Sequence, residues 1–391
     1  MSKVAFVTSH PIQYQVPVFR ELTRRNKLDL TVIFAQIPDA IAQGSGFGVS
    51  FAWDIPLLEG YRHHLLRNVA KRPSVVTYAG CDTPEIASYL KQERFDAVIV
   101  NGWVVKTCLQ TLKACERLGV PCIVRGEANH LRQRPWWKRV LQRWLVRRYS
   151  AYLYIGEANR EFYKSYGVTD DRLFPCRYCI ENERFAQAAE NSELRLRARQ
   201  RWGVQAAGTC FLYSGKFEEK KHPVELVRAF GAAIRQGLQG QLLMVGDGEL
   251  RKECEQLAAR EGWPVLFTGF VNQSQIPEAY AAGDCLVLAS DAGETWGLVV
   301  NEAMAAGRPA IVSSLAGCRA DLIRDGETGW SFQFGEWDEL TAKLLTAAGN
   351  PKQLALMGKA AQQTISRYSP TEAAAGMESA VRWAKQQRAR N

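Results

Sequence analysis

Two carboxylates, one in a short polar loop and one on the helix that follows, have a spacing suited to a polyhydroxylated anion. Glu294 lies in the loop, Glu302 lies on the helix, and Gly297 stands near the helix start. Free backbone N–H groups and the helix dipole favour an anion at such a start, and carboxylates accept hydrogen bonds from hydroxyl groups. A sugar nucleotide needs this combination, because it carries a diphosphate, a ribose and a hexose. By spacing alone, the two glutamates could equally be ordinary solvated residues.

A cationic loop supplies the opposite charge. Lys216 and Lys221 lie between a strand predicted at 209–214 and a helix predicted at 224–234. Two cations on one loop at a strand end can converge on a diphosphate, and glycosyl transfer requires that this leaving group be neutralised. The alternative is that both lysines are solvated loop residues.

An alternation of apolar strands and amphipathic helices must position these groups. The stretch 285–313 contains a strand, the polar loop, a helix that Gly307 and Pro309 end, and a second strand. Such alternation predicts an α/β fold with parallel sheets. The other predicted strands cover 3–9, 28–34, 97–101, 122–125, 152–155, 241–245 and 265–267.

The first half offers its own polar residues where predicted strands end, which is where open α/β sheets bind ligands. They are His10, Trp103, Glu127 and His130. No glycine occurs between Met1 and Gly44, and this argues against a nicotinamide or flavin cofactor. Residues 37–60 are irregular and rich in glycine, and we expect a mobile loop near an acceptor.

The central stretch resembles a known family. Its motif runs through Glu294-Thr-Trp296-Gly297-Leu298, then Asn301-Glu302-Ala-Met-Ala, then Gly307-Arg-Pro309. This is similar to the nucleotide-sugar site of the retaining glycosyltransferases of family 4, which are group 1 glycosyltransferases with the GT-B fold. That fold has two Rossmann-like domains facing a cleft. Trp296 stands where the family usually has Phe, and Lys216 replaces an Arg, whereas Lys221 matches the family's Lys.

The resemblance implies roles for individual residues and a mechanism that retains anomeric configuration. From this resemblance we expect no cofactor and no metal. A nucleoside-diphosphate sugar would be the substrate, and lysines would neutralise the leaving nucleoside diphosphate. The family's strand-end His is replaced by Arg125-Gly126-Glu127, so the catalytic candidates are Glu127, His10 and His130. The implied donor-binding residues are Lys216 and Lys221 for the diphosphate, Gly297 and Leu298 at the helix start, Trp296, Glu294 for the hexose, Glu302 for ribose, and Phe270 or Val271 for the nucleobase; Trp103 would contact the acceptor.

We predict three segments. Residues 1–185 form an N-terminal acceptor-binding Rossmann-like domain, and residues 186–370 form a C-terminal nucleotide-sugar-binding one. Residues 371–391 form a helix that crosses back to the first domain, as in relatives with this fold. Residues 186–206 read as a charged, helix-like linker without a clear hydrophobic face.

Much of the formal net charge of +10 is local. Residues 132–148 hold seven basic residues, three tryptophans and no acid. Their apolar side chains follow helical spacing, so two interpretations remain: a helix that packs by its apolar face, or an interfacial helix at an anionic membrane. Nucleic acid is disfavoured, because the aromatics share one stripe rather than alternating along a groove.

The remaining composition is that of a globular intracellular protein. No run reaches the ~20 apolar residues of a spanning helix, and the first residues do not read as a signal peptide. We therefore expect a cytoplasmic location, with a peripheral position on the inner face of the cell membrane as an extension. The ten cysteines are scattered, and we expect buried free thiols rather than a metal or redox site.

These observations favour transfer of a hexose-type sugar to a hydroxyl of a glycan or lipid-linked acceptor. The alternatives are a sugar-nucleotide epimerase or phosphorylase of the same fold, a nicotinamide-dependent oxidoreductase, and a non-enzymatic membrane- or polyanion-binding module. An epimerase would convert the donor without an acceptor, whereas a binding module would show salt-sensitive binding without sugar-nucleotide binding.

Overall fold

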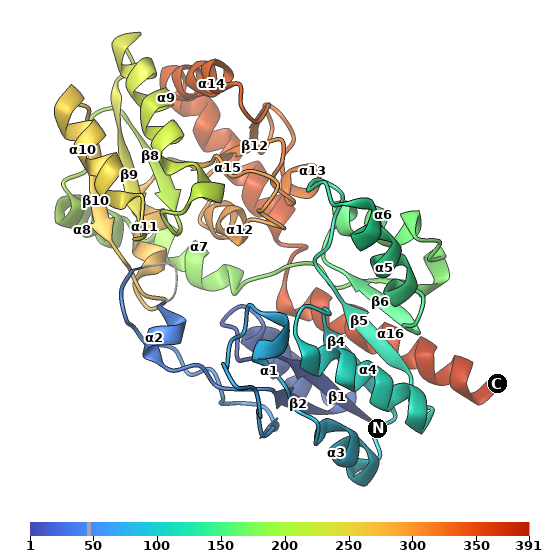
Figure 1. The fold of residues 1–391 in the computed structure, drawn as a ribbon. Coiled ribbons are helices and arrows are strands. Elements are labelled where there is room, and N and C mark those ends of the chain that lie inside the picture. The colour runs from blue at the N-terminus through green and yellow to red at the C-terminus, as the bar shows by residue number, and fades with distance from the viewer. Residues whose placement is uncertain (45–47, 391) are drawn as a thin grey trace. The chain divides into compact units, whose positions relative to one another are not determined.

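The chain forms two compact units in a computed structural model that describes residues 1–44 and 48–390. The first unit contains Met1–Ala42, Pro56–Tyr178 and Pro370–Asn391, and the second contains Gln43–Ile55 and Cys179–Ser369 (Figure 1). The predicted first domain of residues 1–185 therefore differs from the first unit at three places. It includes residues 43–55 and 179–185, which belong to the second unit, and it lacks residues 370–391.

The first unit is built on a parallel sheet, which has seven strands within the described residues, in the order β3-β2-β1-β4-β5-β6-β7. Strands of this kind are covered on both faces and therefore read as continuous apolar runs, which is why most of them were predictable. The strands are β1 (Ser2–Thr8), β2 (Leu28–Phe34), β3 (His63–Leu65), β4 (Ala97–Asn101), β5 (Cys122–Arg125), β6 (Ala151–Tyr154) and β7 (Leu173–Pro175).

Helices connect these strands, and several of them bury an apolar side against the sheet. For example, α4 packs Leu112 and Cys115 into the core and ends at Gly119, which adopts the left-handed conformation that glycine tolerates best. The helices are α1 (Val16–Arg25), α2 (Ala40–Gln43), α3 (Ile86–Glu93), α4 (Lys106–Leu118), α5 (Trp136–Val146), α6 (Glu157–Ser165) and α16 (Pro370–Arg390), with short 3-10 turns η1 (Tyr78–Gly80) and η2 (Asp170–Arg172).

The C-terminal helix α16 packs against α1 and β7 of the first unit. Small buried residues recur along one side of it at helical spacing and permit this close approach. Gly376 is the extreme case, because a Cβ there would lie 1.6 Å from the carbonyl oxygen of Pro175. The buried residues of this side are Ala373, Ala374, Met377, Ala380, Val381 and Ala384.

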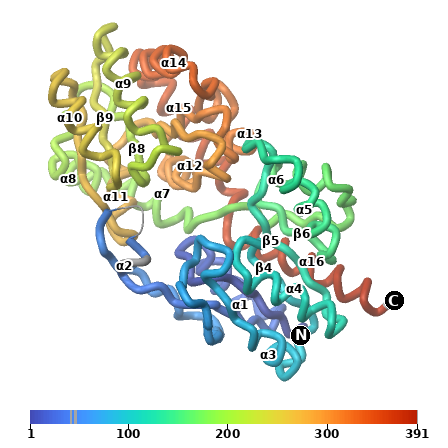
Figure 2. The backbone as a smooth tube through the Cα atoms, viewed as in Figure 1, coloured from blue at the N-terminus to red at the C-terminus, as the bar shows by residue number. Residues whose placement is uncertain are grey.

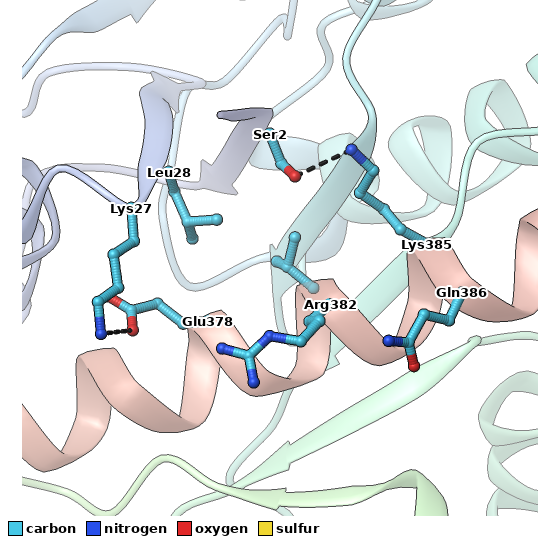
Figure 3. Close-up of a pocket in the computed structure, with 8 residues that line it drawn as sticks. Ser2, Lys27, Leu28, Glu378, Arg382, Lys385 and Gln386 are labelled. Carbon is cyan, nitrogen blue, oxygen red and sulfur yellow. Dashed lines mark hydrogen bonds and ion pairs between the residues drawn. The ribbon is translucent and has the colours of Figure 1, made fainter.

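Charged contacts fix α16 at the amino-terminal ends of β1 and β2. Glu378 accepts two hydrogen bonds from Arg25, of 2.7 and 2.9 Å, and Lys385 donates to the hydroxyl of Ser2. A cavity of about 330 Å³ lies between this helix and Leu28 (Figure 3). It lies at the sheet edge opposite to the one that follows the carboxyl ends of the strands.

The second unit contains another parallel sheet, for which the described residues give six strands in the order β10-β9-β8-β11-β12-β13. Its strands are β8 (Thr209–Ser214), β9 (Gly240–Val245), β10 (Val265–Gly269), β11 (Cys285–Leu288), β12 (Ala310–Ser313) and β13 (Gly329–Phe332). Its helices are α7 (Asn182–Glu190), α8 (Ser192–Trp202), α9 (Pro223–Arg235), α10 (Arg251–Glu261), α11 (Ile276–Ala282), α12 (Leu298–Ala305), α13 (Arg319–Leu322), α14 (Trp337–Gly349) and α15 (Pro351–Ile365), with a 3-10 turn η3 (Glu219–Lys221).

The prediction for 186–206 was correct in its charged, helical character and wrong in making this stretch a linker. Helices α7 and α8 occupy this stretch and pack against α11. Arg195 and Arg199 of α8 both donate hydrogen bonds to Asp284, at 2.6 and 2.7 Å, and also bind carbonyl oxygens at the end of α11. Ionic contacts therefore attach α8 to its neighbours, where a helix usually packs by an apolar stripe. A search for hydrophobic periodicity does not detect such contacts.

The cysteine prediction was confirmed. All ten cysteines, each of which the structure describes, are buried and free. Burial raises the pKa of Cys254 to about 12, which suits an inert core thiol.

We expect Glu378→Ala to destabilise the first unit by about 2 kcal/mol, because it leaves Arg25 half-buried without its bidentate partner. Urea unfolding measures this change. Arg388→Ala on the same helix is the control, since Arg388 is exposed. An equal effect of both variants would contradict the importance of the Arg25 contact.

Candidate functional site

The sheet of the second unit has a topological switch point between β8 and β11. The chain moves outward from β8 to β9 and β10, and then returns to β11 on the other side of β8. Ligands of open α/β sheets bind outside the carboxyl ends of the strands at such a point. The loops that leave β8 and β11 carry Lys216, Lys221 and Glu294, so these predicted site residues lie at the position that topology favours.

Lys221 and Glu294 form a largely buried ion pair across this switch point. Each side chain is only 13% exposed. The two loops are also joined through their backbones, because Asp291 donates its N–H to the carbonyl of Lys220 at 3.0 Å. The predicted diphosphate residue and the predicted hexose residue are thus direct neighbours.

The charges of this cluster shift each other's protonation. Burial would raise the pKa of Glu294, but the ammonium of Lys221 outweighs burial and the pKa is lowered, so the carboxylate is charged at neutral pH. Burial lowers the pKa of Lys216, and nearby Lys220 and Lys221 add to that effect. Three lysines on one loop repel one another, and a bound anion would reduce this repulsion.

Helix α12 begins directly at this loop. Gly297 is its N-cap, with φ of +103°, and a Cβ there would lie 2.7 Å from Leu288. Leu298 is the first helical residue and is partly exposed. The first N–H groups of α12 therefore lie beside the Lys221–Glu294 pair, at an end where the helix dipole favours an anion.

Trp296 has a different position from the one expected of a donor-binding side chain. It is buried, and its indole N–H donates to the side-chain oxygen of Asn301 at 2.8 Å. Trp296 therefore supports the loop from behind. A direct contact of its ring with a donor stays a prediction of the resemblance.

Glu302 faces Tyr280 of α11, whose hydroxyl donates to it at 2.5 Å. Burial raises the pKa of Glu302 to about 7, although this hydrogen bond and the positive charge of Arg184 act in the other direction. Tyr280 and Arg184 were missed in the sequence, because they lie on elements distant in the chain. The tyrosine gave no local signal, and Arg184 stood in the assumed boundary region.

Phe270 and Val271, the predicted nucleobase residues, follow β10 and are partly exposed. The ring of Phe51 stacks on Phe270 at 4.1 Å between centroids. Asp54 accepts hydrogen bonds from Ser274, one of them from its backbone at 3.0 Å. The loop expected near an acceptor thus joins the second unit here (Figure 2), while its residues 45–47 lie outside the described residues.

His222 is a further residue that the sequence analysis missed. It adopts φ of +50°, a left-handed conformation that is uncommon for a residue with a side chain. The sequence did contain a signal for this unusual backbone conformation. His222 precedes Pro223, and a proline disfavours the ordinary helical conformation in the residue before it. The resulting sharp turn ends η3 and starts α9 directly after Lys221.

The sheet of the first unit has its switch point between β1 and β4. His10 follows β1 and Trp103 follows β4. The ring of His10 pairs with the hydroxyl of Ser9 at 2.8 Å, and burial lowers its pKa to about 4, so the imidazole is neutral at pH 7. Gln15, in the same loop, is buried, and both polar atoms of its amide lack a hydrogen-bond partner in the described part of the chain. A ligand or water would satisfy such an amide.

Glu127 belongs to a polar cluster beside this edge. The hydroxyl of Tyr178 donates to its carboxylate, and Nη1 of Arg125 lies 3.6 Å away. The guanidinium of Arg125 also lies over the ring of Tyr178, which contacts Tyr14 edge-on at 5.3 Å. The carboxylate is one-third exposed, so it is oriented by its neighbours and still accessible.

His130 and Trp103 do not join that cluster. His130 is exposed, pairs with the hydroxyl of Ser165 at 2.7 Å and packs on Phe162. Trp103 lies partly buried against the core, also near Phe162. Among the three catalytic candidates, Glu127 is the one that charged and aromatic neighbours orient most closely.

The described residues contain no group of three or more His, Cys, Asp or Glu side chains that could hold a metal ion. Nor does any helix among them have the length and apolar character required to cross a membrane.

Comparison with known proteins gives a domain assignment for the second half. A family model described as "Glycosyl transferases group 1" matches residues 195–364. The sulfoquinovosyl transferase SQD2 of Arabidopsis thaliana is 35% identical over 133 residues, which are 33% of this chain and 25% of the relative. The alpha-D-kanosaminyltransferase of Streptomyces kanamyceticus is 28% identical over 225 residues, which are 54% of this chain and 57% of the relative. The chain thus spans between a quarter and just over half of these relatives.

Solved structures extend the likeness to the whole chain. Anabaena HepE, in complex with UDP and glucose, has a TM-score of 0.71 and 18% identity, covering 100% of this chain and 99% of HepE. The lipopolysaccharide outer core galactosyltransferase WaaB has a TM-score of 0.68 and 17% identity, covering 97% and 99%. The match to the group 1 model is confined to residues 195–364, whereas the likeness of fold extends over the whole chain. The prediction of two Rossmann-like units with the GT-B fold was confirmed.

The raised pKa of Glu302 predicts a pH dependence of stability. Because the folded state holds this proton more tightly than the unfolded state, the contribution is complete below about pH 4.5 and is lost as the pH rises through about 7. Glu302→Gln should remove a loss of about 3 kcal/mol between these limits. Urea unfolding at several pH values tests this, with exposed Glu249→Gln as the control. Parallel pH profiles for wild type and Glu302→Gln would contradict the shift.

Proposed function

We propose that the chain is a glycosyltransferase that moves a hexose-type sugar from a nucleoside-diphosphate sugar to a hydroxyl of a glycan or lipid-linked acceptor. The observation that carries this proposal is the meeting of Lys221, Glu294 and the start of α12 at the switch point between β8 and β11. Cations and free N–H groups suit the diphosphate, and the adjacent carboxylate suits sugar hydroxyls.

In this proposal each donor group has a partner in the second unit. Lys216, Lys221 and the first N–H groups of α12 bind the diphosphate. When Glu294 accepts a hydrogen bond from the hexose, part of its ion pair with Lys221 is lost. Glu302, supported by Tyr280, accepts hydrogen bonds from the ribose.

Phe270 and Val271 contact the nucleobase. Since Phe51 already stacks on Phe270, the base packs beside this aromatic pair or displaces Phe51 from it. Aromatic stacking tolerates many bases, so this contact alone does not select one base.

The reaction we propose retains anomeric configuration and needs no metal. The bond between the anomeric carbon and the diphosphate oxygen breaks, and the acceptor oxygen attacks that carbon on the same face. Lys216 and Lys221 stabilise the negative charge that develops on the leaving diphosphate. The acceptor's proton passes to the departing phosphate oxygen or to a carboxylate, for which Glu127 is our candidate.

Several comparisons support the general activity. The curated relatives are named as transferases of different sugars, and HepE is solved with UDP and glucose. These names agree on sugar transfer and differ in the sugar moved, so the donor sugar and the acceptor of this chain stay open. The expected cytoplasmic location likewise stays a prediction.

A thermal-shift screen against nucleoside diphosphates and their sugars tests the donor site first. A ligand that binds only the folded state raises stability by RT ln(1 + [L]/Kd), about 2.7 kcal/mol at a hundredfold excess over Kd. A shift with one base identifies the donor class. Conversion of the donor without any acceptor would instead indicate an epimerase, and no shift with any nucleotide would contradict the proposal.

Lys221→Ala should abolish donor turnover, with a loss of about a hundredfold or more in kcat/KM, because the leaving diphosphate loses a buried cation. The substitution also leaves Glu294 charged and unpaired. Exposed Lys252→Ala on α10 is the matched control and should retain full activity. Near-wild-type turnover by Lys221→Ala would refute the diphosphate assignment.

Glu127→Gln should lower kcat by about a hundredfold while the nucleotide-induced thermal shift stays unchanged, because Glu127 lies in the first unit. His130→Ala should have little effect on either quantity, since His130 pairs with Ser165 on the surface. The opposite ranking in single-turnover assays would assign the catalytic role to His130.

A further inference from the structure

Helix α5 presents an unusual surface. It was expected either to pack by its apolar face or to lie at a membrane, and the packed arrangement was wrong. Only Leu145 and Val146, at its C-terminal end, are buried. Five of the fifteen exposed large apolar side chains in the described residues lie on this helix of 11 residues. They are Trp136 (76% exposed), Trp137 (51%), Val140 (61%), Leu141 (55%) and Trp144 (56%).

These apolar side chains form one continuous stripe. At about 100° per residue, the five positions fall within an arc of about 140°. Arg143 borders the arc on one side. On the other side buried Leu145 follows Leu141, and Lys138 comes next, whereas buried Val146 points away from the arc. The stripe is therefore exposed from Trp136 to Trp144 and reaches the core only at the C-terminal end of the helix.

The charge around the stripe has a single sign. Residues 132–148 contain seven basic residues and no acid, and they supply most of the formal net charge of +10. In the part of the chain that the structure describes, no ion pair involves Arg132, Lys138, Arg139, Arg143 or Arg147. Arg148 is the exception, because it pairs with Glu116 and lies over the ring of Trp144.

The helix is held in place from its C-terminal half. Arg148 binds Glu116 at the end of α4, and the hydroxyl of Tyr166 reaches Gln142 at 3.4 Å (Figure 1 shows α5 beside α6). The stripe is therefore displayed on a folded element rather than on a loose segment. Exposure of these apolar side chains to water is unfavourable. A partner surface that covered the stripe would remove this exposure.

We propose that α5 is an interfacial anchor that inserts Trp136, Trp137, Val140, Leu141 and Trp144 into the headgroup region of an anionic phospholipid membrane. Tryptophan suits that region, because its ring is apolar and its N–H can donate to lipid oxygens. The unpaired cations meet the negative surface potential of such a membrane. An acidic protein is a poorer match, because a broad stripe with cations of one sign needs an equally extended anionic surface.

The proposed function gives this anchor a use. Helix α5 follows β5 through residues 126–135, a loop that begins beside Glu127 at the carboxyl edge of the first unit's sheet. A membrane bound at the start of α5 would therefore bring a lipid-linked acceptor to the edge where we propose catalysis. This use rests on the proposed function, whereas membrane binding itself does not.

Sedimentation of the full chain with vesicles tests the anchor. Wild type should bind vesicles of phosphatidylcholine mixed with phosphatidylglycerol and should bind pure phosphatidylcholine at least tenfold more weakly. Binding should weaken as salt is added, because salt screens the charges. Lys138→Gln/Arg139→Gln/Arg143→Gln should weaken binding to anionic vesicles by about a hundredfold.

The apolar stripe is tested by Trp137→Ser/Leu141→Ser/Trp144→Ser, which should lose at least tenfold in vesicle binding. Val76→Ser/Leu196→Ser/Leu356→Ser is the matched control, because these apolar side chains lie elsewhere and are at least as exposed, and it should bind as wild type does. Equal binding by both triple variants, or no vesicle binding by wild type, would overturn the proposal. So would an α5-dependent dimer or RNA complex without vesicle binding.

The nucleotide thermal shift, measured on the same variants, keeps the two proposals separate. Vesicle binding that depends on α5 without any nucleotide shift would leave the anchor in place and refute the glycosyltransferase. A nucleotide shift without vesicle binding would do the reverse.

Discussion

The ion pair between Lys221 and Glu294 joins the two loops on which the second unit's candidate site depends. A carboxylate this enclosed would be costly if unpaired, and its partner cation compensates that cost. The pair also keeps a negative charge beside lysines that would otherwise repel one another. An entering diphosphate can pair with the lysines in place of Glu294. A sugar hydroxyl can donate a hydrogen bond to Glu294 in place of Lys221. The same contact can thus stabilise the empty site and prepare it for a ligand that carries both chemistries.

Both sheets place their polar residues by the same geometric constraint. Parallel strands deliver all their carboxyl ends to one edge, and a reversal in strand order opens a position between two diverging loops. In the second unit that position gathers lysines and carboxylates, whereas in the first it gathers neutral His10, buried Gln15 and the nearby Glu127 cluster. This difference in charge agrees with our proposal of a diphosphate-bearing donor for the second edge and a hydroxyl-bearing acceptor for the first.

Sequence reasoning succeeded where local pattern decides structure. The apolar runs located β2, β4, β5, β8 and β12, because buried parallel strands are short, continuous apolar segments between turn residues. The charged loops after β8 and β11 were located by their motif. What failed depended on contacts between distant residues: α8 packs through Arg195 and Arg199, Tyr280 meets Glu302 from another helix, and α5 turns its apolar stripe outward. None of these is encoded in a local period of hydrophobicity.

The two units exchange short pieces of chain. Gln43–Ile55 belongs to the second unit, although the first unit flanks it in sequence, and α16 returns from the far end of the chain to cover α1 and β7. Neither unit is therefore one uninterrupted stretch of sequence. Helix α16 contributes buried residues to the first unit, so this unit cannot be completed until α16 has been synthesised. A chain without α16 would leave the apolar surface of α1 and β7 that it covers open to water.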